Sequence, residues 1–191
     1  ASRTPLYEIA AHSPAPIVLC GDNVDGVLVT PRLFERYFMP VYEAQGAALH
    51  AQGKLMAVHM DGARLLNAAV KLGVPASEIV ADCDTVWIDF TKGLGAPLGA
   101  VLAGSADFIG EDWRWKQRLG GSMRQSGVVA AAALYALEHN WDRLAEDHDN
   151  AHRLAAGLAN IKGIECAVDK MQTNLVFFEV KKPGMTGAQF V

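Results

Sequence analysis

Two residues that could perform covalent and acid–base chemistry follow predicted strands. Asp61 comes after the apolar run 55–58, and Lys92 comes after the β-branched and aromatic run 85–90. In open α/β sheets, ligands bind outside the carboxyl ends of the strands. Arg64 lies three residues after Asp61, in the first turn of the next predicted helix, so its side chain can point the same way. We therefore expect an acid, an arginine and a lysine to converge on one cavity.

The residues around this acid and this lysine indicate which ligand the cavity could take. Gly62 lets a ligand or a neighbouring backbone come close, and Lys92 is followed by Gly-Leu-Gly, which leaves open space around its amine. Pyridoxal 5'-phosphate requires such a set, because its aldehyde needs an amine for a Schiff base and its pyridine nitrogen needs a carboxylate to stay protonated. An arginine can hydrogen-bond the phenolic oxygen of the ring. The residues thus predict a pyridoxal-phosphate site.

Strand-like and helix-like segments alternate around these candidate residues. The strands are expected at 17–19, 55–58, 85–90, 98–103, 164–168 and 175–180. The helices are expected at 31–39, 41–52, 63–72, 105–118, 127–139 and 141–161. We expect Pro40 to kink or break its helix, and the nearly all-apolar helix 127–139 to be buried on all sides. The alternation predicts an α/β fold with a mainly parallel sheet flanked by helices.

Composition excludes several classes of protein. The chain has 191 residues, is 51% hydrophobic and carries a net charge of −4, which is typical of a globular protein and not of a disordered chain or a nucleic-acid binder. No apolar run reaches the ~18 residues of a membrane span, and the first residues lack the pattern of a signal peptide. Three widely spaced cysteines indicate reduced thiols in a cytoplasmic protein. Both ends of the sequence look cut.

Three ordered blocks of the sequence resemble the L-threonine aldolase family, the β-eliminating-lyase branch of the aspartate-aminotransferase fold. The blocks are HMDGARLLNA, VWIDFTKGLGAPLGAVLAG and RWKQRLGGSMRQSG, and the later QTNLVFFEV is also similar. The resemblance covers roughly residues 58–180. It implies that residues 1–160 form part of the large pyridoxal-phosphate-binding domain of the aspartate-aminotransferase-like fold. Residues 161–191 would then begin a small C-terminal α+β domain.

The same resemblance assigns roles to individual residues. Lys92 would form the Schiff base, Asp61 would pair with the pyridine nitrogen, and Arg64 would contact the phenolic oxygen. Arg124 would lie near the cofactor or the neighbouring subunit. The implied reaction is cleavage of L-threonine or a similar β-hydroxy-α-amino acid to glycine and an aldehyde. The implied assembly is a homo-oligomer, a dimer or tetramer, that takes a small-molecule amino-acid substrate and neither nucleic acid nor membrane.

Other functions remain open from the sequence. The chain could be another fold-type-I pyridoxal enzyme, either a β-eliminating lyase or an aminotransferase. It could also be a catalytically incomplete fragment that acts only as a packing or interaction module, since neither a phosphate loop nor a ring-stacking histidine is recognisable before Ile17. A metal hydrolase built on His59 and Asp61 ranks last. A metal site needs a third ligand, and the pair His148 and His152 on one predicted helix supplies none, so no metal is predicted.

Overall fold

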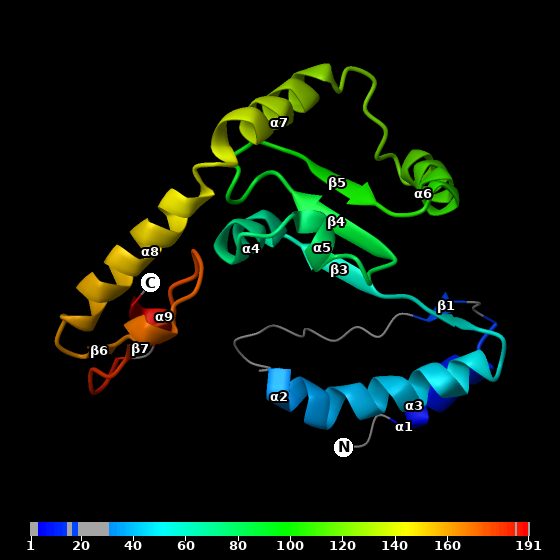
Figure 1. Cartoon of the computed structure of the whole chain (residues 1–191), viewed down its shortest axis with the longest axis horizontal. Coiled ribbons are helices and arrows are strands. Elements are labelled where there is room, and N and C mark those ends of the chain that lie inside the picture. Colours follow the sequence, from blue (N-terminus) through cyan, green and yellow to red (C-terminus); the bar gives the residue numbers. More distant parts are fainter. Residues whose placement is uncertain (1–3, 15–16, 19–30, 186, 191) are drawn as a thin grey trace. The chain divides into compact units, whose positions relative to one another are not determined.

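The computed structural model describes residues 4–14, 17–18, 31–185 and 187–190 (Figure 1). The chain divides into two compact units, residues 1–59 and 60–191, and each is described by itself. The polar turn expected at 21–23 and the helix cap expected at Thr30 lie outside the described residues.

The first unit contains a parallel pair of short strands. Strand β1 (Ile17–Val18) pairs with β2 (Leu55–Met56), and Ile17 lies opposite Leu55. Both strands fall where apolar runs predicted them, and β2 ends at Met56, two residues before its predicted end. Helix α1 (Thr4–His12) precedes this pair in the chain. Parallel strands need a long crossover connection, and the helical segment between β1 and β2 is part of one. A tight hairpin would instead have paired the strands antiparallel.

Residues 31–50 of the connection between β1 and β2 are helical across Pro40. Of the two outcomes predicted for this proline, a kink or a break, the break is therefore wrong. The segments are α2 (Pro31–Leu33), a π-helical turn (Phe34–Phe38) and α3 (Met39–His50). The N–H of Met39 donates to the carbonyl of Phe34, five residues back. Pro40 then occupies the first turn of α3, where the backbone N–H that proline lacks has no intrahelical role. The wide turn before it lets the helix continue.

The second unit is built on a mixed sheet in the order β3-β4-β5. Its strands are β3 (His59–Gly62), β4 (Thr85–Asp89) and β5 (Ala100–Ala103). β4 and β5 run antiparallel, with Val86 opposite Ala103 and Asp89 opposite Ala100. The predicted α/β class is confirmed. Among the described strand pairs, β1 and β2 are parallel, whereas β4 and β5 are antiparallel. A short glycine-rich connection between β4 and β5 favours the antiparallel arrangement.

Asp61 lies at the end of a strand as predicted, but that strand is β3 and not the predicted run 55–58. The apolar run 55–58 supplies β2 only as far as Met56, and the polar stretch after it forms β3. Along β3 the side chains alternate between exposed (His59 and Asp61) and more buried (Met60 and Gly62). This period of two is typical of a half-buried strand, and it explains how a polar sequence joins the sheet.

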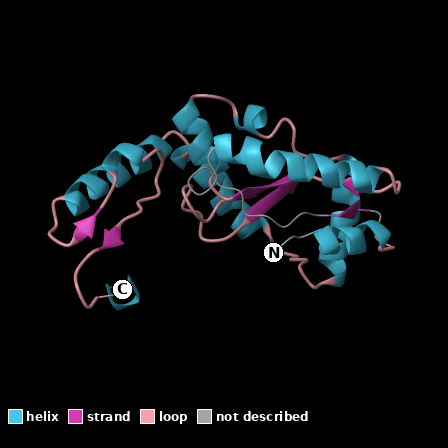
Figure 2. Cartoon of the chain, turned by 90° about the horizontal axis from the view of Figure 1, so that it is seen from below, coloured by secondary structure: helices cyan, strands magenta, loops and turns pink. Residues whose placement is uncertain are grey.

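Helices of the second unit lie beside this sheet, and the last two of them lead away from it, as Figures 1 and 2 show. They are α4 (Leu65–Leu72), α5 (Ala76–Ile79), α6 (Ala106–Arg118), α7 (Gly127–Asn140), α8 (Leu144–Ala159) and α9 (Gly187–Phe190). Two predicted helix ends are confirmed. Ser105 caps α6 by accepting a hydrogen bond from the N–H of Phe108 at 3.2 Å. Gly73 ends α4 in the left-handed conformation, with φ of 67°.

Helix α7 is largely exposed, so the prediction of all-round burial is wrong. Only Ala133 and Ala136 of this helix are buried, whereas Val128 is 81% exposed and Tyr135 is 60% exposed. Ala133 and Ala136 pack in the core and Leu137 packs against it, whereas Val128, Leu134 and Tyr135 are exposed. The buried core comprises Leu66, Phe90, Leu94, Ala96, Ala133, Ala136 and Leu144. It therefore joins α4, the segment after β4, α7 and the start of α8.

The chain closes with two very short antiparallel strands. They are β6 (Ile164–Glu165) and β7 (Glu179–Val180), separated by a single 3-10 turn (Val168–Lys170). Both lie inside the ranges predicted to be strands and are shorter. Because α8 packs on β6 and on the 3-10 turn, this last segment rests on the helix before it. The boundary proposed at residue 161 stays a prediction.

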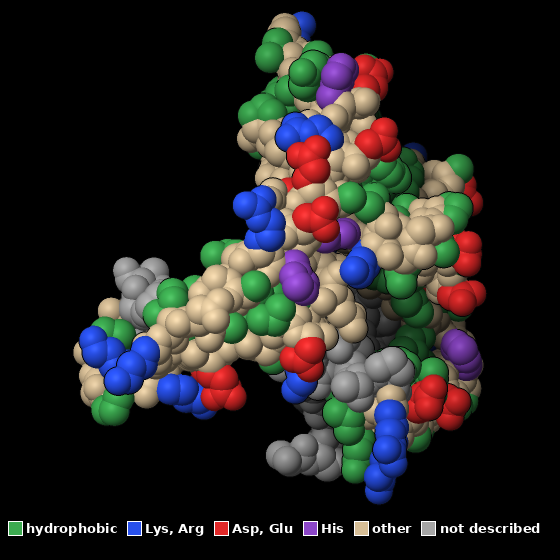
Figure 3. All heavy atoms as spheres, turned by 60° about the vertical axis from the view of Figure 1, so that its left-hand side comes forward, with side chains coloured by type: hydrophobic (Ala, Val, Ile, Leu, Met, Phe, Trp, Pro, Cys, Tyr) green, Lys and Arg blue, Asp and Glu red, His purple; other side chains and the backbone are tan. Residues whose placement is uncertain are grey.

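Charged side chains of both signs share the surface of the described residues. On the face drawn in Figure 3, acidic groups lie beside basic ones. Exposed ion pairs of this kind include Arg114 with Glu111 and Arg143 with Glu146, each three residues apart on a helix. Within the described part of the chain, no helix is both long and apolar enough to cross a membrane.

Candidate functional site

The end of β4 carries a buried acid beside the candidate lysine. Asp89 is the last residue of the strand, and Lys92 follows three residues later. The amine of Lys92 forms an ion pair with Oδ2 of Asp89. The side chain of Asp89 is 6% exposed and that of Lys92 is 36% exposed. The lysine thus reaches solvent while its amine is held by a carboxylate of the strand.

The carboxyl group of Asp89 is strongly acidic. Burial by itself raises its pKa, because a charge is poorly solvated away from water. Hydrogen bonds from the amine of Lys92 and from Thr91, together with the charge of Lys92, outweigh burial and lower the pKa to about 2. Thr91 contributes its hydroxyl at 2.7 Å and its backbone N–H at 2.8 Å, both to Oδ1. Asp89 is therefore a carboxylate at neutral pH.

Hydrogen bonds fix the glycine-rich turn that contains Lys92. The N–H of Gly95 donates to the carbonyl of Lys92 at 2.9 Å, and the N–H of Ala96 donates to the carbonyl of Phe90 at 2.8 Å. From α7, the side-chain amide of Asn140 donates to the carbonyl of Leu94 at 2.7 Å. Gly95 adopts a φ of 67°, which other residues rarely take. The turn is thereby attached both to its own strand and to a distant helix.

Asp61 and Gly62 lie on the strand next to β4. Oδ1 of Asp61 accepts a hydrogen bond from the N–H of Ala63 at 3.0 Å, which orients this exposed carboxylate at the start of the connection to α4. Gly62 lies so close to β4 that a Cβ atom there would be 2.3 Å from the carbonyl oxygen of Trp87. The sequence predicted a close approach at Gly62, and the neighbour that approaches is the strand carrying Asp89 and leading to Lys92.

Replacing Gly62 with alanine is expected to lower the free energy of unfolding by about 1–3 kcal/mol, because the new methyl group would push β3 away from the backbone of β4. Urea denaturation would measure this loss. Gly110→Ala is the matched control, since a Cβ atom at this position in α6 meets open space. The control should stabilise the protein by about 0.5–1 kcal/mol. Equal effects of the two substitutions would contradict the close approach.

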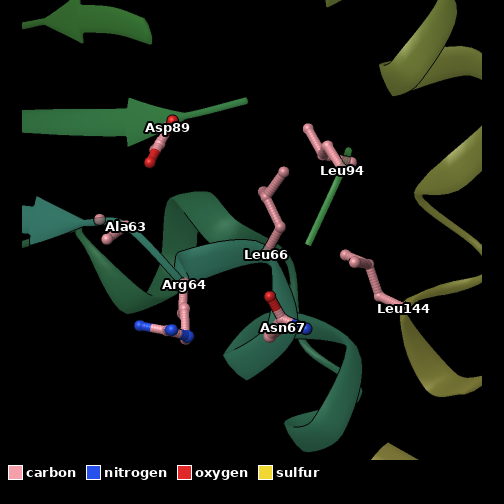
Figure 4. Close-up of a pocket in the computed structure, with 8 residues that line it drawn as sticks. Ala63, Arg64, Leu66, Asn67, Asp89, Leu94 and Leu144 are labelled. Atoms are coloured by element: carbon pink, nitrogen blue, oxygen red, sulfur yellow. The ribbon is translucent and has the colours of Figure 1, made fainter. Parts of the chain in front are cut away.

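A small pocket lies between the end of β3, the start of α4 and the end of β4. Its lining residues are Gly62, Ala63, Arg64, Leu66, Asn67, Asp89, Leu94 and Leu144. Figure 4 shows Asp89 reaching from its strand toward the pocket, while the guanidinium group of Arg64 points away from that carboxylate. Asn67 is 2% exposed, and its side-chain nitrogen has no hydrogen-bond partner among the described residues. The pocket therefore combines an apolar wall with buried polar groups.

The structure brings part of the predicted set together. Arg64 lines the same pocket as Asp89, and Asp89 holds Lys92. Asp61 does not line this pocket and lies one residue before Gly62, which does. Arg124 is exposed in the turn just before α7 and is not part of the pocket lining. The roles predicted for these residues stay predictions.

Sequence reasoning missed the polar side chains that support Lys92. Asp89 falls within the predicted strand 85–90, and its pattern, a carboxylate in an otherwise apolar run three residues before a lysine, is unusual. Asn67 and Asn140 gave no pattern of their own, because each contacts or faces a turn that is distant in sequence. These contacts could be found only in three dimensions.

The histidines give no indication of a metal centre. Across the residues that the structure describes, no group of three His, Cys, Asp or Glu side chains could hold a metal ion. Burial is the main cause that lowers the pKa of His148, and the charge of Lys71 adds to it. The lowered pKa keeps His148 neutral at pH 7. His148 lies on α8, which packs on α4, so we interpret it as a packing residue.

Comparison with known proteins assigns this chain to a family. A family model described as β-eliminating lyase matches residues 39–181. The chain belongs to the β-eliminating lyase family. Among members of this family, it is 44% identical over 190 residues to the probable low-specificity L-threonine aldolase 2 of Arabidopsis thaliana, covering 99% of this chain and 51% of that protein. It is 46% identical over 127 residues to the low specificity L-threonine aldolase of Escherichia coli K12, covering 65% and 37%.

A solved structure agrees with this family assignment. It comes from Listeria monocytogenes EGD-E and is provisionally named an L-allo-threonine aldolase. The two superimpose with a TM-score of 0.61 at 26% identity, over 91% of this chain and 47% of the other. The α/β fold of this family member is thus aspartate-aminotransferase-like, as predicted. The chain spans about half, or less, of the length of the curated relatives that it matches.

Proposed function

We propose that this chain belongs to a pyridoxal-phosphate-dependent lyase that cleaves L-threonine or similar β-hydroxy-α-amino acids to glycine and an aldehyde. One observation carries the proposal. The segment Asp61-Gly62-Ala63-Arg64 and the segment leading to Lys92 lie at the ends of two neighbouring strands, β3 and β4, with Gly62 against the backbone of Trp87. Family membership and relatives that are named threonine aldolases support the same reaction.

The residues present fit pyridoxal 5'-phosphate. Lys92 offers a primary amine that solvent reaches at the end of a strand. Asp61 offers an exposed carboxylate, and the hydrogen bond it accepts from Ala63 occupies only one of its oxygens. Lys92 would hold the aldehyde carbon, Asp61 would hold a proton on the pyridine nitrogen, and Arg64 would donate to the phenolic oxygen. When bound, the cofactor supplies an electron-accepting ring for cleavage of the Cα–Cβ bond.

Further features support the rest of the proposal. The apolar side chains of Trp113, Leu119 and Val128 are 57%, 80% and 81% exposed, and covering them would favour a homo-oligomer, either a dimer or a tetramer. The free thiols of Cys83 and Cys166 fit the reducing cytoplasm. Arg124 would lie near the cofactor or the neighbouring subunit. The family description also favours a second candidate reaction, β-elimination, which would release ammonia and a keto acid.

Chemical trapping tests the proposal directly. Purified protein would be incubated with pyridoxal 5'-phosphate, reduced with borohydride, digested and analysed by mass spectrometry. We expect the reduced label on Lys92, and we expect glycine and acetaldehyde from L-threonine. Equal labelling of Lys92 and the exposed Lys71 would contradict a specific cofactor site. Release of ammonia and a keto acid without aldehyde would favour the second candidate reaction.

A further inference from the structure

Asp89 has no role in the proposed reaction, yet it is the polar group most closely tied to Lys92. It occupies the last position of β4, where its side chain is 6% exposed. A buried carboxylate is costly unless donors surround it. Within the described residues, the hydrogen bonds to the carboxylate of Asp89 come from Thr91 and Lys92, on the turn that follows it.

The two oxygens of Asp89 have different partners. Oδ1 accepts both hydrogen bonds from Thr91, at 2.7 Å from the hydroxyl and 2.8 Å from the backbone N–H. This double contact fixes the rotation of the carboxylate. Oδ2 is then directed at the amine of Lys92, with which it forms the ion pair. A charge-assisted bond of this kind constrains direction as well as distance.

The ring of Trp87, on the same face of β4 as Asp89, restricts the position of the Lys92 amine from another side. Trp87 precedes Asp89 by two residues, so both side chains leave β4 on one face. The amine of Lys92 lies 5.2 Å from the centre of the Trp87 ring, within the range of a cation–π contact. The amine is therefore held between an aromatic ring and a carboxylate.

The backbone of Lys92 is restrained independently of its side chain. Its carbonyl accepts from the N–H of Gly95, and Asn140 holds the next part of the turn through Leu94. Among charged residues, Arg64 at the start of α4 lines the same pocket as Asp89. The amine can therefore move away from Asp89 by rotation of the Lys92 side chain, while the backbone of the turn stays in place.

We propose that Asp89 is a positioning residue for Lys92, and that its Thr91-oriented carboxylate holds the lysine amine in one direction until a ligand takes its place. The reason a positioned amine matters rests on the proposed function, but the restraint itself does not require any cofactor. Asp89 stays ionised throughout the neutral range, so it directs the amine and is not a store for the amine's proton. A proton lost from the amine would pass to water.

Competitive acylation in the absence of any cofactor tests the restraint. Wild-type protein, Asp89→Asn and Glu146→Gln would be treated briefly with acetic anhydride, and the rate at each lysine read by mass spectrometry. Asn keeps the shape of Asp89 but removes its charge, and Glu146→Gln removes an exposed partner at the same three-residue spacing, with Arg143. We expect the rate at Lys92 to rise roughly three- to fivefold in Asp89→Asn only, as for a partly exposed ion pair. An unchanged rate at Lys92 would overturn the proposal.

A spectroscopic measurement decides the matter if Asp89→Asn does not fold. The carbon-13 resonance of the Asp89 carboxyl group would be followed near pH 4 in wild-type protein and in Lys92→Gln, which alters a partly exposed side chain. In wild-type protein the group should stay ionised, because its pKa is about 2. Loss of the lysine should raise the pKa of Asp89 and move the resonance toward the protonated form, whereas identical resonances would refute the pairing. Neither test uses pyridoxal 5'-phosphate, so failure of the proposed function would be seen separately, in the trapping experiment.

Discussion

Replacing Lys92 with alanine is expected to abolish formation of glycine and acetaldehyde from L-threonine, with a loss of about 1,000-fold or more. The physical reason is that no other primary amine is placed at this strand end to act as the nucleophile, and covalent catalysts are not replaced by their neighbours. Product formation would be followed with a coupled assay for acetaldehyde, in the presence of added pyridoxal 5'-phosphate.

Two further variants show that this loss comes from chemistry and not from unfolding. Lys92→Arg keeps a positive charge beside Asp89 but has no primary amine, so it should be as inactive as Lys92→Ala and fold as well as the wild type. Lys71→Ala removes an exposed lysine of α4 and should retain activity. Substantial activity in Lys92→Arg would exclude Lys92 as the nucleophile.

Leu144→Ala is expected to lower the free energy of unfolding by about 2–5 kcal/mol, the largest stability effect that we predict. Leu144 is 1% exposed, lies in the core beside Leu94, and lines the same pocket as Asp89. Its removal would leave a cavity directly behind the turn of Lys92, because a methyl group of Leu144 packs against Gly93. Urea denaturation followed by circular dichroism would measure the loss.

Leu154→Ala provides the matched control for this prediction. It makes the same chemical change on the same helix, α8, at a side chain that is 56% exposed. Its effect should stay within about 0.5 kcal/mol, since few contacts are lost at the surface. Comparable losses from both variants would mean that the core does not centre on Leu144.

The outcome for α7 shows where sequence patterns succeed and where they fail. The pattern predicted a helix at 127–139, and α7 covers 127–140. The prediction that α7 is buried on all sides was wrong. An apolar composition does not show which face of a helix packs on the core and which face stays exposed. The break predicted at Pro40 is absent for a different reason. The rule that proline breaks a helix assumes regular α-geometry, and the π-helical turn before Pro40 changes that geometry.

The site shows the same division between local and distant information. Asp61, Arg64 and Lys92 could be selected from the sequence because each lies within a few residues of a glycine or a strand end. Asp89 was within reach of the same reasoning, but its importance depends on the direction of the Lys92 side chain. The hydrogen bond from Asn140 to Leu94 joins residues 46 positions apart, and no local pattern predicts it.

That single bond couples two regions of the second unit. If the last turn of α7 frays, Asn140 releases the carbonyl of Leu94, and the turn loses this hydrogen bond to a helix. The amides of Gly95 and Ala96, which bond within the turn, should then exchange with solvent through the same opening as the end of α7. The turn that carries the amine of Lys92 is therefore held in part by the C-terminal end of α7. A substitution that loosens the end of α7 should also loosen this turn.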